Sequence, residues 1–154
     1  MRTHQADLLT SIILAIFHNN GHLLSSGDRL VASLGLTSSR WQVLGAVALS
    51  AMPLSAPQIG AAMGITRQGS QQQIALLIKT GLLEPLPNPA NKRSPLYALT
   101  QHGRNIYTQL EHIQACWANQ IVVGFTEDDL ITTNRVLDRI ALRLAIAPDW
   151  SDAP

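Results

Sequence analysis

The spacing of apolar residues divides most of the chain into helices. Over about residues 5–24, apolar side chains recur every three or four positions, which predicts a long amphipathic helix. Its apolar stripe consists of Leu9, Ile12, Ile13, Ile16 and Phe17. Gly27-Asp28 is expected to break this helix, and a short helical turn is expected over 29–34.

The next part alternates helix signals with stop signals. Apolar spacing predicts a helix over about 39–50, with hydroxyl caps before it and Pro53 after it. The stretch 54–56 is short enough to be a single-bridge strand that pairs with a later hairpin. Another helix starts near Pro57 and ends at Gly64, which readily takes a left-handed conformation. Its expected buried side is Ile59, Ala62 and Met63.

A polar helix and a hairpin follow. Thr66 is expected to cap a helix over Arg67–Lys79, whose inner stripe is Ser70, Ile74, Leu77 and Ile78. Short extended runs at 82–86 and 96–99 flank the sequence PNPANKRSP. Three prolines and two asparagines in that loop predict an exposed, mobile hairpin tip with few regular hydrogen bonds.

Two further helices complete the chain. One is expected over 101–123, with the stripe Ile106, Leu110, Ile113, Trp117 and Ile121. The other starts after Thr126, opens with three acids and stops before Pro148. The last residues, from Asp149, are expected to be loose.

This order predicts a mainly α fold with a small β-hairpin wing, that is, a winged helix-turn-helix flanked by N- and C-terminal helices. We expect a single domain over 1–154. Within it, 38–104 would be the winged-helix lobe, and 4–34 and 105–147 would be dimerisation helices. A winged helix places one helix in the major groove of DNA.

Composition narrows the class of protein. A hydrophobic content of 46% and a charged content of 14% fit a folded chain with apolar surface to cover, which favours an oligomer. The apolar run 8–17 is about half the length of a membrane span, and no signal peptide is expected. The single cysteine, Cys116, excludes an intramolecular disulfide and fits a cytoplasmic protein.

Charge is unevenly distributed. The segment 54–104 contains five basic residues and one acid, for a net charge of +4, whereas the remainder has six basic and nine acidic residues, for −3. A cationic segment in a slightly acidic scaffold indicates a polyanion as partner, here double-stranded DNA. A chance clustering of solvated cations is the alternative.

The helix over 67–79 carries the residue types that read DNA. Glutamine pairs with adenine and arginine with guanine in the major groove, and the glycine allows close backbone approach. An acid-free, amide-rich face is unusual for a merely solvated surface. Two hairpin cations are expected to contact phosphates or the minor groove. The candidate DNA-binding residues are Thr66, Arg67, Gln68, Gly69, Gln71, Gln72, Gln73, Lys92 and Arg93.

Several short motifs, in this order and spacing, resemble the MarR (multiple-antibiotic-resistance regulator) family of winged-helix transcription factors. They are Gly35-Leu36-Thr37, Arg40-Trp41-Gln42-Val43-Leu44, Ile59-Gly60, Gly64-Ile65-Thr66, Gly81-Leu82-Leu83, Asn91-Lys92-Arg93, and Leu99-Thr100 with Gly103. The resemblance covers nearly the whole chain.

The resemblance implies a homodimer held by the first and last two helices. It also implies a pseudo-palindromic DNA site, usually bound by a repressor that a small phenolic or carboxylate ligand releases. One feature departs from the family pattern: the wing usually carries acidic residues where this chain has Asn88 and Asn91, while Arg93 matches the wing arginine. The departure leaves open how that arginine is held.

Ligands in the family often bind between the dimer helices and the DNA-binding lobe. Candidates here are His18, His22, Arg40, Trp41 and Trp117, because a cation with aromatic rings suits an aromatic acid. The alternative is that the tryptophans pack in the core and the arginine is a surface residue.

No metal site and no cofactor is expected. His18 and His22 share a helical face, but two ligands are half a site, so ordinary polar histidines are favoured. Cys116 does not match the position of the sensing thiols of some relatives, and a packed, inert thiol is expected.

No catalytic constellation is apparent, so an enzyme is not expected. The main prediction is a sequence-specific DNA-binding regulator. It would be a homodimeric repressor of a pseudo-palindromic operator, and a small aromatic or phenolic ligand would relieve the repression. The alternative is a winged-helix module that binds protein partners and no DNA, whose mark would be an apolar outer face on the helix over 67–79.

Overall fold

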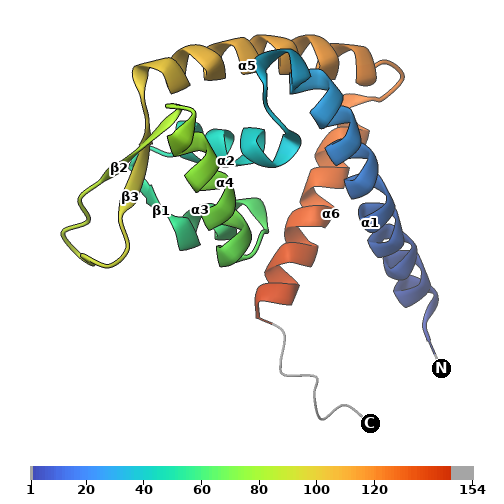
Figure 1. The fold of residues 1–154 in the computed structure, drawn as a ribbon. Coiled ribbons are helices and arrows are strands. Elements are labelled where there is room, and N and C mark those ends of the chain that lie inside the picture. The colour runs from blue at the N-terminus through green and yellow to red at the C-terminus, as the bar shows by residue number, and fades with distance from the viewer. Residues whose placement is uncertain (1, 147–154) are drawn as a thin grey trace. The chain divides into compact units, whose positions relative to one another are not determined.

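A computed structural model describes residues 2–146 and confirms a mainly helical winged-helix fold (Figure 1). The elements are α1 (His4–Val31), η1 (Ala32–Leu34), α2 (Ser38–Leu49), β1 (Leu54–Ser55), α3 (Ala56–Met63), α4 (Arg67–Lys79), β2 (Leu83–Leu86), β3 (Leu96–Leu99), α5 (Gln101–Ile121) and α6 (Glu127–Ala145). They form two compact units that divide within α5, between Ala115 and Cys116. The expected loose end, from Asp149, lies outside the described residues.

The predicted break at Gly27-Asp28 is wrong, because α1 continues to Val31. A Cβ atom at Gly27 would lie 2.2 Å from the Ser38 Oγ, so the glycine allows α1 and α2 to approach closely. Asp28 Oδ1 accepts a hydrogen bond of 2.7 Å from the Ser38 backbone N–H at the start of α2. Both residues therefore join two helices instead of ending one.

The core of the first unit lies between α2, α3, α4 and the sheet. Its largest fully buried apolar side chains are Leu44, Ile59, Ile74, Leu77, Leu83, Leu110, Val31 and Val43. The predicted inner stripe of α4 is confirmed, with Ser70, Ile74 and Leu77 buried. On α3 the prediction for Ala62 is wrong: this residue is exposed, and Gly60 is buried in its place.

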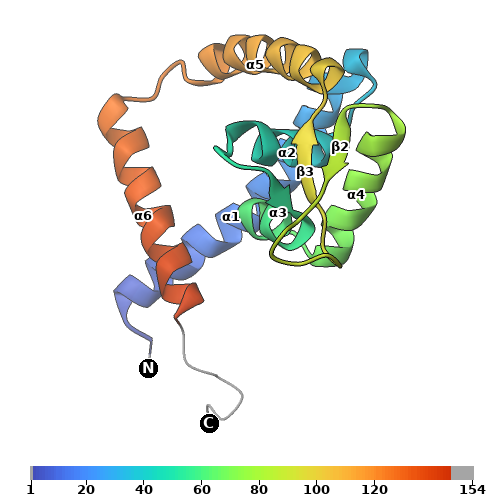
Figure 2. The ribbon, with the colours of Figure 1, turned by 90° about the vertical axis from the view of Figure 1, so that its left-hand side faces the viewer.

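A three-stranded antiparallel sheet, in the order β1-β3-β2, forms the wing. Leu54 pairs with Tyr97 and Ser55 with Leu96, which confirms the predicted short strand. Pro85 is accommodated in β2 because this strand is at the edge of the sheet. Figure 2 shows α3 and α4 beside the hairpin of β2 and β3, which carries a long loop.

The start of α5 is fastened to the end of α4. The Thr100 hydroxyl donates to the Gly81 carbonyl at 2.6 Å, and the Thr100 backbone N–H donates to the Leu82 carbonyl at 3.1 Å. These bonds fix the point where the chain leaves β3. Because Leu82 directly precedes β2 and Thr100 directly follows β3, these bonds also hold the two ends of the hairpin together.

Large apolar side chains are exposed on α1 and in the second unit. On α1 they include Leu8, Leu9, Ile12, Leu14, Ile16, Phe17 and Leu23. In the second unit they include Val123, Phe125, Ile131, Leu142 and Leu144. Across the described residues, none of the helices combines the length and the apolar character needed to cross a membrane.

Candidate nucleic-acid interface

The turn between α3 and α4 is held by close backbone packing. The Ile65 backbone N–H donates to the Gly60 carbonyl at 3.0 Å, and Gly64 has the left-handed φ of 64° that the turn requires. A Cβ at Gly60 would lie 3.0 Å from the Ile65 carbonyl oxygen. Two glycines therefore set the geometry of the turn. Gly60 allows the close approach of the Ile65 carbonyl, and Gly64 adopts the left-handed conformation.

A buried serine anchors the inner side of α4. The Ser70 side chain is fully buried, and its Oγ lies 3.0 Å from the Ala56 carbonyl oxygen and 2.8 Å from the Arg67 carbonyl oxygen. The hydroxyl proton is shared between the first residue of α3 and the first residue of α4. This contact keeps one face of α4 against α3, so the opposite face stays outside.

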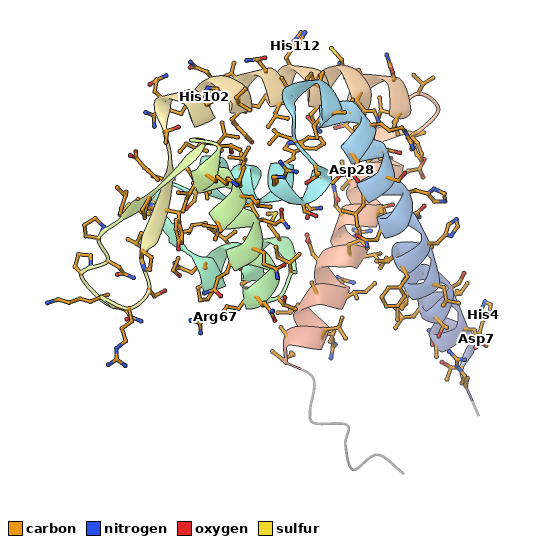
Figure 3. The ribbon with its side chains drawn as sticks, viewed as in Figure 1. His4, Asp7, Asp28, Arg67, His102 and His112 are labelled. Carbon is orange, nitrogen blue, oxygen red and sulfur yellow. The ribbon has the colours of Figure 1, made fainter. Side chains whose placement is uncertain are left out.

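The first two turns of α4 have a polar outer face that is cationic at its start and free of acids, whereas Ala75 and Leu76 are exposed in its later turns. Arg67, Gln68, Gln71 and Gln72 are exposed, and Gln73 is partly buried. Arg67 projects outward from the beginning of the helix (Figure 3). This face presents the amide and guanidinium groups that pair with base edges in the major groove.

Thr66 and Gly69 shape the beginning of α4. The Thr66 Oγ1 accepts a hydrogen bond of 3.0 Å from the Gly69 backbone N–H. A Cβ at Gly69 would lie 3.2 Å from that same oxygen. The glycine thus has a local reason, the fit of the cap, in addition to the close approach to DNA expected from the sequence.

The wing loop is mostly exposed, as predicted, and local turns instead of strand pairing organise it. The Asn88 Nδ2 donates to the Ser94 carbonyl at 2.7 Å, and its Oδ1 accepts from the Ala90 N–H at 3.1 Å. The Asn91 Oδ1 accepts from the Arg93 N–H at 3.1 Å. Asparagine side chains form such turns as aspartate side chains do, so the turn at Asn91 positions the backbone of Arg93.

Lys92 and Arg93 are both exposed at the tip of this loop. Among the described residues, no acidic side chain forms a salt bridge with Arg67, Lys92 or Arg93. Salt bridges within residues 2–146 therefore do not neutralise these three charges. Unpaired cations at a loop tip and at a helix start suit contacts with phosphates.

The five candidate ligand residues belong to three different helices, α1, α2 and α5. Trp41 is partly buried against the core, and a Cβ at Gly27 would lie 3.7 Å from its ring. His18 and His22 are exposed and contact each other on α1. Trp117 is partly buried and belongs to the second unit.

Arg40 lines a cavity of the first unit with a volume of about 210 Å³. Its Nη1 donates to the Gly35 carbonyl at 3.1 Å, while its Nε is buried and has no hydrogen-bond partner among the described residues. Thr80 and His102 also line this cavity, and Figure 3 places His102 near the start of α5. No pattern in the sequence links these two residues to Arg40, because only the fold brings them together.

Cys116 is exposed, so the expectation of a packed thiol is wrong. Successive residues of a helix are rotated by about 100°, and Cys116 therefore lies well away from the stripe that contains its neighbour Trp117. The exposure does not by itself assign a redox role.

Tyr107 and Asp129 have shifted pKa values, but neither belongs to the candidate interface. Burial, and to a lesser degree the charge of Glu111, raises the pKa of the Tyr107 phenol. Hydrogen bonds from Thr126 lower the pKa of Asp129, which caps the start of α6. Neither shift therefore bears on the surface formed by α4 and the wing.

Comparison with known proteins supports the same interpretation. A family model described as "MarR family" matches residues 34–94. The uncharacterized protein Rv2011c of Mycobacterium tuberculosis is 33% identical over 135 residues, which are 88% of this chain and 82% of that protein.

Solved structures extend the match over nearly the whole chain. The crystal structure of the MarR family transcription regulator SP03579 is similar with a TM-score of 0.75 and 26% identity, covering 94% of this chain and 97% of that one. The structure of CouR from Rhodococcus jostii RHA1, bound to p-coumaroyl-CoA, has a TM-score of 0.74 and 18% identity, covering 89% and 93%. The second similarity concerns the fold alone.

Proposed function

Because the chain belongs to the MarR family of transcription regulators, we propose that it binds a specific, pseudo-palindromic DNA site as a homodimer and represses transcription there. Members of this family are DNA-binding regulators and not enzymes. The operator sequence, the sign of regulation and the effector go beyond family membership. The proposals for the DNA contacts, for the dimer and for the effector rest on particular residues of this chain.

The outer face of α4 is the observation that carries the proposal. Its first two turns expose Arg67 and three glutamines and no acid, and Ser70 fixes the helix from the opposite side. Farther along the helix, Ala75, Leu76 and Lys79 are exposed. A buried anchor and a polar outer face allow α4 to enter a major groove without disturbing the core. We assign base contacts to Arg67, Gln68, Gln71 and Gln72, with Gln73 at the margin.

The wing supplies the second set of contacts. Lys92 and Arg93 stand on a loop that Asn88 and Asn91 organise, so their side chains start from a fixed backbone. We assign them to the phosphate backbone or to the adjacent minor groove. Contacts of this kind add affinity for any sequence, whereas those of α4 add preference for one sequence.

The exposed apolar side chains of α1 and of the second unit favour a homodimer. On α1, Leu9, Ile12 and Ile16 are exposed at helical spacing, and an apolar stripe of this kind is unusual on the surface of a monomer. We assign residues 4–34 and 105–147 to the dimer interface and 38–104 to the DNA-binding lobe. In the dimer the two α4 helices would enter successive major grooves about 34 Å apart.

The cavity beside Arg40 supports a small acidic effector. Its volume of about 210 Å³ is below the roughly 300–1,000 Å³ of sites for drug-sized ligands, so it suits a one-ring carboxylate or phenolate. Arg40 and His102 would hold the acid group, and Leu36 and Ile106 would contact the ring. CouR, which has this fold, was crystallised with p-coumaroyl-CoA, an aromatic thioester.

A gel-shift experiment on the DNA upstream of its own gene tests this function. The expected result is one shifted band containing two chains per DNA, absent with scrambled DNA of the same composition. Adding a panel of aromatic acids should release the DNA, and Arg40→Ala should abolish release while leaving the shift. Absence of any salt-sensitive DNA binding, here and on heparin resin, would favour the alternative of a protein-binding module.

A further inference from the structure

The geometry points to a two-histidine clamp on α1 that binds one divalent transition-metal ion. His18 and His22 are one helical turn apart, and their Nε2 atoms lie 3.0 Å from each other. The ring centroids are 4.6 Å apart and the ring planes are inclined by 78°. Both side chains are exposed, so an ion in solution reaches them.

The separation of the two nitrogens fits two bonds to one ion. An imidazole nitrogen lies about 2.0–2.1 Å from a bound metal, so two such bonds at a right angle place the nitrogens about 2.9 Å apart, and a tetrahedral angle places them about 3.4 Å apart. The observed 3.0 Å is close to the right-angled case. Neighbouring positions of a square or octahedral ion have this angle.

The contact is a hydrogen bond when one of the two Nε2 atoms carries a proton. The ring positions also fit one ion bound to both nitrogens. Each nitrogen is about 1.2 Å from its ring centroid, so a straight N–H···N bond of this length would set the centroids about 5.3 Å apart. An ion bonded to both nitrogens at a right angle would set them about 4.6 Å apart. The observed centroid separation is 4.6 Å, so one ion position accounts for both distances.

The donor set indicates which ions bind. Imidazole suits copper, nickel and zinc, and nitrogen donors at right angles favour Cu²⁺ or Ni²⁺. In the described part of the chain, no group of three or more histidine, cysteine or acidic residues could hold a metal ion. Water would therefore occupy the remaining positions, and the order of affinity would place Cu²⁺ first.

His18 and His22 lie on one side of α1. At 100° per residue, Leu9 and Ile16 lie on the opposite side, whereas the exposed Leu14 lies on the side of the histidines. A titration with metal measures metal binding directly, so its outcome does not depend on DNA binding.

The test is calorimetric titration of the full chain with CuSO₄, NiCl₂ and ZnCl₂ in a weakly coordinating buffer. A His4→Ala background removes another histidine of the same helix. We expect one Cu²⁺ per chain, with weaker Ni²⁺ and Zn²⁺. His18→Ala or His22→Ala should weaken Cu²⁺ binding at least roughly tenfold, because the second nitrogen then no longer adds its effective concentration.

A matched control keeps the number of histidines and changes their spacing. The double variant His22→Ala with Asn20→His places the two rings on different sides of α1, and it should bind Cu²⁺ as weakly as the single variants. Circular dichroism checks that all variants remain helical. Equal Cu²⁺ affinity of the parent and the spacing variant, or of the parent and a chain lacking both histidines, would overturn the proposal.

Discussion

Gly103 in the first turn of α5 offers a sharp test of how the wing is attached to the core. A Cβ at this position would lie 2.0 Å from the Leu82 carbonyl oxygen and 3.0 Å from its carbonyl carbon. Both atoms belong to a buried backbone segment, and that oxygen accepts the Thr100 N–H at 3.1 Å. The substitution Gly103→Ala therefore forces a backbone shift of about 1 Å in a packed region.

The expected loss of stability combines three effects. Overpacking costs about 1–3 kcal/mol. Weakening the hydrogen bond between Thr100 and Leu82 costs about 0.5–1.5 kcal/mol more. The better helix propensity of alanine returns about 1 kcal/mol, which leaves a net loss of about 2 kcal/mol in the free energy of unfolding.

Urea unfolding followed by circular dichroism, at one fixed protein concentration, measures this change. Gly45→Ala is the matched control, because a Cβ at that helical position meets no heavy atom within 4 Å. It should raise the free energy of unfolding by about 0.5–1 kcal/mol. If Gly103→Ala were as stable as Gly45→Ala, the close contact between α5 and the end of α4 would not exist in the molecule.

Three further predictions concern α4, the wing and α5. Ser70→Ala should lower the free energy of unfolding by about 1–3 kcal/mol in the same urea assay, since a buried carbonyl of α3 loses its donor; no loss would contradict the anchor. Asn91→Asp should retain the hydrogen bond from the Arg93 N–H but weaken DNA binding at low salt, because it adds a negative charge to the wing. Fluorescence anisotropy measures the DNA affinity, and an unchanged affinity would count against a DNA contact of the wing. The pKa of the Tyr107 phenol is raised in the folded state, so this group should contribute stability that is present below pH 10 and is lost as the pH rises through the folded-state pKa. Ultraviolet titration should find this pKa above its usual value, and the variant Glu111→Gln should lower it. An unshifted titration would refute the assignment.

The elements could be predicted because each carries local signals. The bounds of α4 follow from the Thr66 cap and the apolar spacing, and β3 follows from its turn-rich flank. The prediction of a helix break at Gly27 was wrong because a glycine in a sequence indicates only that a side chain does not fit there, and not for what reason. Whether the reason is a turn or a close neighbour depends on Ser38, eleven residues away, and only the fold supplies that contact.

The candidate interface was predictable to a lesser degree than the fold. Polar residues on an otherwise apolar-striped helix identify the outer face of α4 from sequence alone. The meeting of Arg40, Thr80 and His102 at one cavity depends on tertiary packing, and no spacing rule contains it. The role of Asn91 in holding the wing was not predicted either. The family pattern has an acidic residue in the wing, but asparagine keeps a side-chain oxygen that accepts the same hydrogen bond.

The most direct test of the central claim is the salt dependence of DNA affinity for Arg93→Ala and Gln72→Ala, measured by fluorescence anisotropy on upstream and scrambled DNA. Lys79→Ala, at the far end of α4, is the charge-matched control. Arg93→Ala should weaken binding to both DNAs and reduce the salt slope by about 1, whereas Gln72→Ala should lose about 1–3 kcal/mol on the upstream DNA only. If both variants kept the parent's affinity, sequence preference and salt slope, α4 and the wing would not be the surface that binds DNA.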